Sequence, residues 1–259
     1  MMQRARRVFV GIIVLMISLL ILARSASPVP QGVCGKRRLF YANGILIWSS
    51  TSAAGLLYKS GLAIDADGAY RAYHPNDRLG LDSLAHAGHS GNWWALVTDN
   101  EKSSGRPVVQ LESDPAPGYY VSTTALYDAE NANVRDPHRY VDAVTIPYVV
   151  IHPKLLNLVH LGDFATVLNL QNDKMSGAIV ADVSARNLPV GEGSIALAEA
   201  IGIESSPRRG GVDGGVVYLI YPNSGDRRPR TLQETIGMSR ELFESWGGGE
   251  TLHACWVAK

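Results

Sequence analysis

Three short apolar segments, each bounded by turn-forming residues, constrain the fold of this chain more than any other feature. They cover residues 164–170, 177–183 and 216–221, and each has the length of a buried strand rather than of a core helix. The chain also contains 26 glycines and 13 prolines, whereas apolar residues at helical spacing are scarce. This pattern predicts a mainly β fold with many turns.

Other segments complete the expected secondary structure. Asn43 and Gly44 lie between two stretches of β-branched and aromatic residues, an arrangement typical of a tight hairpin turn. The stretches WWALVTD and PVVQ predict two strands joined by a polar loop. Residues 194–201 and 232–243 have the spacing and end signals of helices. We therefore expect one α+β domain, mainly β with a few short helices, over residues 41–259.

The N-terminal segment has the features of a targeting sequence. Arg4, Arg6 and Arg7 precede an apolar run over residues 8–23, after which small residues and prolines follow. The run is short for a membrane span and long for the apolar part of a cleaved signal peptide. We expect residues 1–27 to be a signal peptide or a signal anchor, and residues 28–40 to be a linker. The domain would then be extracellular, either secreted or anchored at the outer face of the membrane.

The only two cysteines, Cys34 and Cys255, lie near opposite ends of the exported part. In an oxidising compartment such a pair favours a disulfide that joins the two ends, and two unpaired thiols are the alternative. No paired Cys or His spacing accompanies either residue, so the sequence does not predict a zinc site.

The charge balance excludes a general attraction to polyanions. Lys plus Arg and Asp plus Glu number 24 each, so any charge selectivity must be local. The basic pair Arg208-Arg209 lies in a polar loop, where solvation is a simpler explanation than nucleic-acid binding. The turn Asp65-Ala66-Asp67-Gly68 has two carboxylates but lacks the later ligands of a calcium loop. We expect a monomer with no metal, no cofactor and no nucleic-acid partner.

Two carboxylates are placed where they can face one cleft. Asp182 ends an expected buried strand, and Glu192 lies between Gly191 and Gly193 immediately before an expected helix. Glycosidic bond hydrolysis requires such a pair, one to protonate the leaving oxygen and one to act on water or on the anomeric carbon. Alternatively, Asp182 caps a turn and Glu192 interacts with the helix dipole.

A series of stretches in one order resembles a known family. GLAIDADGA, WWALVTD, PVVQ, DPAPGYYVSTTAL, RYVDAVTIPYVVI, LGDFA, AIVADV and GEGSIALAEAIGI together are similar to the fungal-type chitosanases of glycoside hydrolase family 75. The resemblance covers residues 61–221. It implies endo-hydrolysis of β-1,4-linked glucosamine polymers with inversion at the anomeric carbon, and it implies Asp182 and Glu192 as the catalytic pair. We expect Glu192 to act as the acid and Asp182, ionised, to act as the base.

Binding of such a polymer would require carboxylates for its ammonium groups and aromatic faces for its rings. Asp65, Asp67 and Asp163 lie in the matched stretches and are candidates for the first role, and Trp94 and Tyr120 are candidates for the second. Arg186 lies in the loop between the catalytic carboxylates, where a cationic polymer disfavours positive charge.

The strand, Asp, loop, acid and helix are similar in order to the signature of six-stranded double-psi β-barrels, so we expect such a barrel with a cleft formed by its loops. Two other functions remain open. One is hydrolysis of peptidoglycan or another amino-sugar polymer. The other is non-catalytic carbohydrate binding at the cell surface, with the carboxylates only structural.

Overall fold

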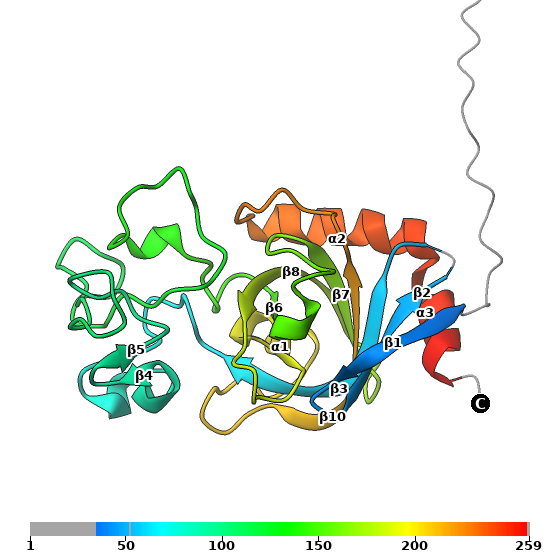
Figure 1. Ribbon diagram of the computed structural model, residues 1–259, viewed down its shortest axis with the longest axis horizontal. Coiled ribbons are helices and arrows are strands. Elements are labelled where there is room, and N and C mark those ends of the chain that lie inside the picture. Colours follow the sequence, from blue (N-terminus) through cyan, green and yellow to red (C-terminus); the bar gives the residue numbers. More distant parts are fainter. Residues whose placement is uncertain (1–34, 52, 258–259) are drawn as a thin grey trace, which may run out of the picture.

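The computed structural model describes residues 35–51 and 53–257 and shows a mainly β protein with a closed six-stranded barrel (Figure 1). The barrel consists of β3 (Leu56–Asp65), β10 (Val212–Tyr221), β7 (Phe164–Asn169), β8 (Met175–Val183), β6 (Tyr148–Ile151) and β9 (Glu192–Ser194), in that spatial order. A parallel pairing of β9 with β3 closes the sheet. The expected mainly β fold with a barrel core and few short helices is confirmed.

The three apolar segments form barrel strands β7, β8 and β10, as predicted, with ends that differ by a few residues. The predicted hairpin is also present, with β1 (Lys36–Ala42) and β2 (Ile45–Ser50) joined by Asn43 and Gly44, at φ values of 42° and 82°. Positive φ at both positions suits this pair of residues. Because β1 begins at Lys36, the folded part starts inside the stretch 28–40 that we expected to be a linker.

Three helices complete the domain. The first, α1 (Ile195–Ala200), begins after Ser194, whose Oγ accepts a hydrogen bond from the Leu197 N–H (3.1 Å). The longest, α2 (Leu232–Trp246), packs on β7 and β8. Both were predicted. The last, α3 (Gly248–Val257), was not predicted, because its first residues are glycines and glycine disfavours helix interiors.

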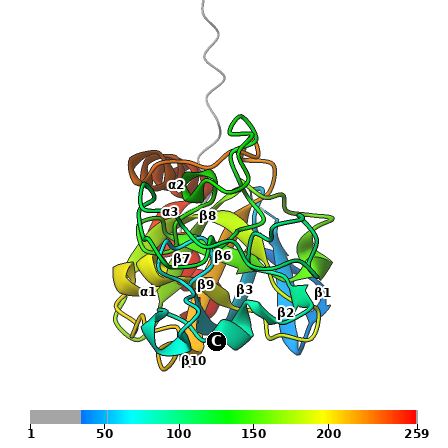
Figure 2. The same cartoon turned by 90° about the vertical axis from the view of Figure 1, so that its left-hand side faces the viewer.

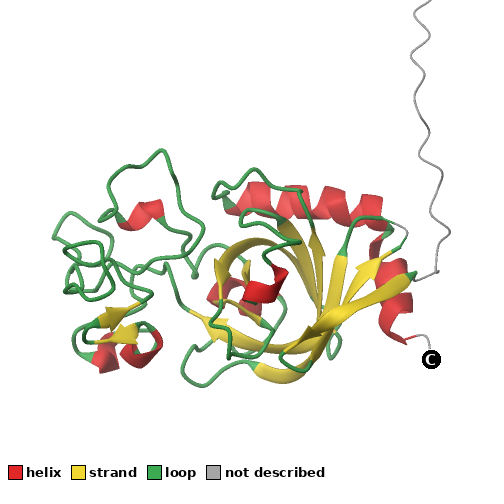
Figure 3. Cartoon of the chain, viewed as in Figure 1, coloured by secondary structure: helices red, strands yellow, loops and turns green. Residues whose placement is uncertain are grey.

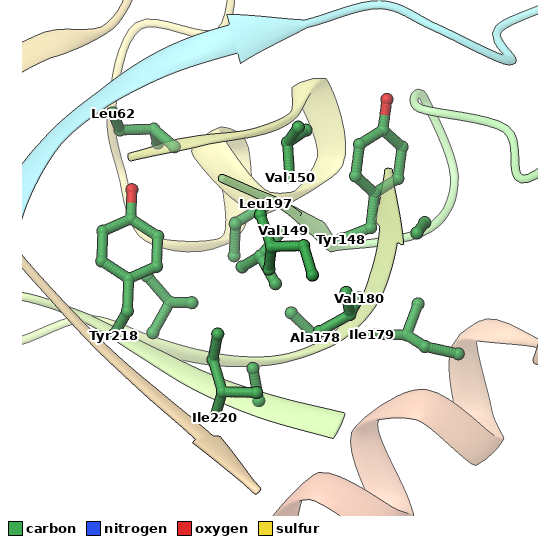
Figure 4. Packing of buried hydrophobic residues seen from close by; sticks show 14 of the residues in the cluster. Leu62, Tyr148, Val149, Val150, Ala178, Ile179, Val180, Leu197, Tyr218 and Ile220 are labelled. Atoms are coloured by element: carbon green, nitrogen blue, oxygen red, sulfur yellow. The ribbon is translucent and has the colours of Figure 1, made fainter. Parts of the chain in front are cut away.

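The barrel interior is filled by aliphatic and aromatic side chains. Figure 4 shows residues of several strands and of α1 meeting there, among them Val149, Val180, Leu197 and Ile220, all with 0% relative exposure. Such close packing fixes the strand ends that surround the interior, because a densely filled core has low compressibility. The barrel is therefore a rigid support for side chains at its rim.

A long insert, residues 66–147, connects β3 to β6 and consists mostly of loops and turns (Figure 3). Its regular strands are the two-residue pair β4 (Gly88–His89) and β5 (Asn92–Trp93). The predicted strand pair of WWALVTD and PVVQ is wrong as regular structure, since these segments meet through one isolated bridge, Thr98 with Pro107, and a backbone hydrogen bond from Val108 N–H to the Val97 carbonyl (2.9 Å). With the insert turned toward the viewer, its loops lie in front of one end of the barrel (Figure 2).

The apolar N-terminal run and Cys34 lie outside the described residues. Within the part of the chain that the structure describes, no helix has the length and apolar character to cross a membrane. Signal peptide and signal anchor both remain predictions.

The described chain begins beside its C-terminal helix. The Lys36 ammonium donates a hydrogen bond to the Cys255 carbonyl and lies over the ring of Trp256, 4.2 Å from its centroid. Cys34 precedes Lys36 by two residues. The predicted disulfide between Cys34 and Cys255 would therefore join segments that already lie together.

Replacing both cysteines by serine should lower the free energy of unfolding by about 2–4 kcal/mol, because the unfolded chain would lose a long covalent loop. Equilibrium urea unfolding of the double variant, compared with the oxidised and the reduced wild-type protein, measures this change. Two free thiols in the non-reduced wild-type protein, counted with a thiol reagent under denaturing conditions, would contradict the disulfide.

Candidate active site

Four neighbouring barrel strands bring one residue each to the same level. Ala63 of β3 pairs with Glu192 of β9, Glu192 pairs with Val150 of β6, and Val150 pairs with Asp182 of β8. Residues that pair directly point to the same face of a sheet, and here all four line one cavity. Asp182 and Glu192 are thus two strand spacings apart, about 10 Å between Cα atoms.

A β-bulge brings Asp182 to this level. Val149 pairs with Val180, but the next residue of β6, Val150, pairs with Asp182, so Ala181 is the extra residue. The Ala181 carbonyl accepts the Leu126 N–H of the insert (2.8 Å). Bulges commonly redirect a side chain in this way.

Two backbone donors fix the Asp182 carboxylate. Its Oδ1 accepts the N–H of Val183 (2.7 Å) and the N–H of Ala125 (3.3 Å). Among the described residues no hydrogen bond reaches Oδ2. One oxygen is therefore held in place, and the other is available to a molecule in the cavity.

The cavity has a volume of about 670 Å³ and lies between the barrel rim and the insert. Five carboxylic side chains line it, and none of its described lining residues is Lys or Arg: the five are Asp65, Asp67, Asp82, Asp182 and Glu192. A second hollow of about 360 Å³ continues beyond Asp67 and Asp182, which line both, and is bordered by Thr123–Ala125. Trp94 also lines both hollows.

Asp65 and Asp67 belong to a hydrogen-bonded turn at the end of β3. The Asp67 N–H donates to Asp65 Oδ1 (2.8 Å), and the Tyr73 hydroxyl donates to Asp67 Oδ1 (2.7 Å). The Tyr148 hydroxyl donates to the Asp67 carbonyl (2.9 Å). Tyr73 of the insert and Tyr148 of β6 therefore both fix this turn. The sequence contained no signal for either contact.

Asp65, Asp67 and Asp182 each offer one carboxylate oxygen, and these atoms lie within 4.8 Å of one another. The spacing suits a shared cation, either a metal ion or an ammonium group. The expectation that the protein binds no metal stays a prediction.

Burial and mutual repulsion change the acidity of these groups. Burial, followed by the charges of Asp65 and Asp182, raises the pKa of Glu192 to about 8. Burial raises the pKa of Asp65 to about 6, against the lowering effect of the Asp67 N–H. It also raises the pKa of Asp182 well above its usual range, and Asp65 adds to this shift. A protonated Glu192 agrees with the expected acid, whereas the expectation that Asp182 stays ionised in the free protein is not supported.

The glycines around Glu192 are explained by the packing of β9. A Cβ on Gly191, where φ is 109°, would lie 2.2 Å from Ser60 Oγ and 2.4 Å from the Gly61 carbonyl oxygen. A Cβ on Gly193 would lie 2.7 Å from the Tyr148 carbonyl oxygen. Both glycines are therefore required by the close packing of β9 between its neighbours, and polymer access is not needed to explain them.

Of the residues predicted to bind substrate, Asp65, Asp67 and Trp94 line the cavity, and two do not. Asp163 is fully buried elsewhere, with its carboxylate bonded to backbone N–H groups. Tyr120 packs against the hydrophobic core. The contacts of these two residues are structural, and neither residue lines the cavity.

No protein-family model matches this sequence, and a comparison with curated proteins finds no significant match. The chemical interpretation therefore depends on the geometry of the cavity and on the sequence motifs that line it.

Proposed function

We propose that this protein is an endo-acting, inverting glycoside hydrolase that cleaves a β-1,4-linked glucosamine polymer such as chitosan. The observation that carries the proposal is the placement of Asp182 and Glu192 on either side of Val150, facing one cavity. Cα atoms about 10 Å apart allow inward-pointing carboxyl groups the separation of roughly 6.5–9.5 Å that an inverting enzyme needs for an intervening water. The motif resemblance to chitosanases supports the same reaction.

In the proposed mechanism, Glu192 donates its proton to the glycosidic oxygen as the bond from that oxygen to the anomeric carbon breaks. A water molecule attacks the anomeric carbon from the opposite face, and the free Oδ2 of Asp182 accepts the proton that the water loses. The products leave, and the two carboxyl groups return to their starting protonation states by exchange with solvent.

The charge of the cavity favours a cationic substrate. Ammonium groups near Asp65 and Asp67 would replace repulsion among carboxylates by attraction, and would thereby lower the pKa values that burial has raised. Asp182 would in this way become ionised when the polymer binds. Arg186 is not among the residues that line either hollow, although its neighbours Ala185 and Asn187 line the first.

The second hollow supports cleavage within a chain. Asp67, Asp182 and Trp94 lie where the two hollows meet, so sugar units can extend to both sides of the reacting bond. An enzyme that removes single terminal sugars would need only one closed pocket.

The test is hydrolysis by the full-length protein in mild detergent, with soluble chitosan, chitin oligomers and peptidoglycan offered in parallel. Proton NMR during the first turnovers should show the α-anomer of a glucosamine oligomer as the initial product. Addition of EDTA should leave the rate unchanged.

Cleavage of peptidoglycan alone would keep the reaction and change the substrate. An initial β-anomer would contradict inversion, and loss of activity in EDTA would assign the Asp65, Asp67 and Asp182 oxygens to a metal ion. If none of the three polymers is cleaved, the enzymatic proposal is wrong and carbohydrate binding becomes the better interpretation.

The raised pKa of Glu192 predicts how activity depends on pH. A general acid must be protonated and a general base ionised, so kcat/KM should decrease as the pH rises above about 8, where Glu192 loses its proton. It should also decrease on the acid side, where Asp182, whose pKa burial raises, keeps its proton. A ¹³C NMR titration of labelled glutamate carboxyl groups in the free protein should contain one resonance that titrates near pH 8 and that is absent from Glu192→Gln. The variant Asp65→Asn should shift that titration to lower pH, because a neighbouring negative charge is removed. Titration of every glutamate below pH 6 would contradict the prediction.

A further inference from the structure

An Asp–His pair on the insert faces the same cavity. His86 Nδ1 lies 2.9 Å from both carboxylate oxygens of Asp82, and Asp82 also accepts the N–H of Ser83 (2.7 Å). Asp82 is almost fully buried, whereas the side chain of His86 is 61% exposed, and both residues line the cavity. A carboxylate can only accept, so Nδ1 carries a proton and Nε2 is left for another partner.

The backbone of His86 also fixes the orientation of the Trp94 ring. The Trp94 indole N–H donates to the His86 carbonyl (2.7 Å), and the His89 ring contacts Trp94 edge-on. Trp94 is nevertheless 57% exposed and lies where the two hollows meet. An exposed indole that is held in one orientation presents a flat apolar face, and such a face suits the C–H surface of a pyranose ring.

A third contact fixes this wall to the barrel. Arg208, which precedes β10, donates to the carbonyl groups of Asp82 (2.7 Å) and Gly80 (3.3 Å) and pairs with Asp77 (3.2 Å). Arg208 is therefore a structural link and not the solvated loop residue that we expected. A wall that is rigid before the ligand arrives loses little entropy on binding.

We propose that His86 and Trp94 form a sugar-binding subsite, in which one pyranose unit of the polymer stacks on Trp94 and donates a hydroxyl or ammonium hydrogen to His86 Nε2. This inference rests on the proposed function. With Nδ1–H bound to Asp82, the neutral form of the His86 ring has a lone pair at Nε2, so the ligand group at this position must be a donor. Asp82 orients the ring and does not itself contact the sugar.

The experiment measures binding separately from catalysis. Full-length Glu192→Gln protein is titrated calorimetrically with a glucosamine hexamer, alone and combined with a second substitution. His86→Ala should weaken binding about tenfold, the effect of one lost hydrogen bond. His86→Gln, whose amide can reach the position of Nε2, should stay within about threefold of the parent, whereas His86→Asn, which can bond only Asp82, should resemble the alanine variant.

The chain offers a matched control. His138 pairs with Asp136 through Nδ1 at 2.9 Å and is 62% exposed, yet it does not line either hollow. His138→Ala should leave the affinity unchanged. The subsite proposal would be wrong if His86→Ala and His138→Ala weakened hexamer binding equally, or if His86→Ala did not weaken it. In either case, binding of the hexamer by the Glu192→Gln parent would still agree with the proposed function. If the Glu192→Gln parent does not bind the hexamer and the wild-type protein does not cleave it, both proposals are wrong. This outcome is distinguishable from failure of the subsite alone, in which the parent still binds the hexamer.

Discussion

Replacing Glu192 by glutamine should lower kcat for chitosan between about 10²- and 10⁴-fold, because the amide cannot protonate the leaving oxygen. Binding of a glucosamine oligomer should be largely kept, since Asp65 and Asp67 remain in the cavity. Release of reducing ends measures the rate, and titration calorimetry measures the affinity. Asp182→Asn should cause a loss of similar size, because the attacking water would lose its base.

The same Glu192→Gln variant should be more stable than the wild-type protein at pH 8 and above. Folding raises the pKa of Glu192 from its usual value to about 8, so the folded state holds a proton that the unfolded state has lost. Stability therefore decreases as the pH rises between these two values, and the neutral amide avoids this loss. We expect a gain on the order of 2 kcal/mol, measured by urea unfolding at pH 8.5 and absent at pH 4.

A control for the loss of activity lies in α1. Glu199 is exposed and accepts a hydrogen bond from the Ser205 hydroxyl (3.1 Å), outside the cavity. Glu199→Gln should leave kcat unchanged, because Glu199 does not line the cavity. If Glu192→Gln lost activity and also lost stability at pH 8.5, Glu192 would have a structural role and the assignment as general acid would be wrong.

The fold was predictable where single segments carry a clear signal. Apolar runs such as residues 164–170 gave the barrel strands, and Asn43-Gly44 gave the hairpin, because both depend on local sequence. The insert and the N-terminal end of α3 were not predictable, since loops with few regular hydrogen bonds and a helix that begins with glycines leave no periodic pattern. The pairing of β9 with β3, which closes the barrel, joins short segments far apart in sequence.

The site was predictable in part for the same reason. Asp182 and Glu192 belong to one strand-loop-helix unit, so their neighbourhood could be inferred from a continuous stretch of sequence. Asp82 and His86 belong to the insert and reach the cavity only through tertiary contacts such as those of Arg208. A carboxylate in a matched motif does not reveal whether it faces a ligand or the backbone. Asp163 lies in such a motif, and its carboxylate is bonded to backbone N–H groups.

Replacing Asp163 by alanine should lower the free energy of unfolding by at least about 3 kcal/mol. Asp163 is fully buried, with 0% exposure, and its carboxylate accepts the N–H groups of His160 (2.8 Å), Asn223 (3.1 Å) and Gly225 (3.1 Å). It thereby joins the turn before β7 to the turn after β10. Alanine would leave these buried donors without an acceptor, and each such donor costs about 1–3 kcal/mol.

This prediction separates a structural carboxylate from a functional one. Urea unfolding measures the loss for Asp163→Ala, and Asp213→Ala, at an exposed position in β10, should change stability by less than about 0.5 kcal/mol. At low temperature, where the Asp163→Ala protein is still folded, its KM for chitosan should equal that of the wild-type protein, because Asp163 does not line the cavity. A raised KM with unchanged stability would instead show that Asp163 binds substrate, as the motif alone had indicated.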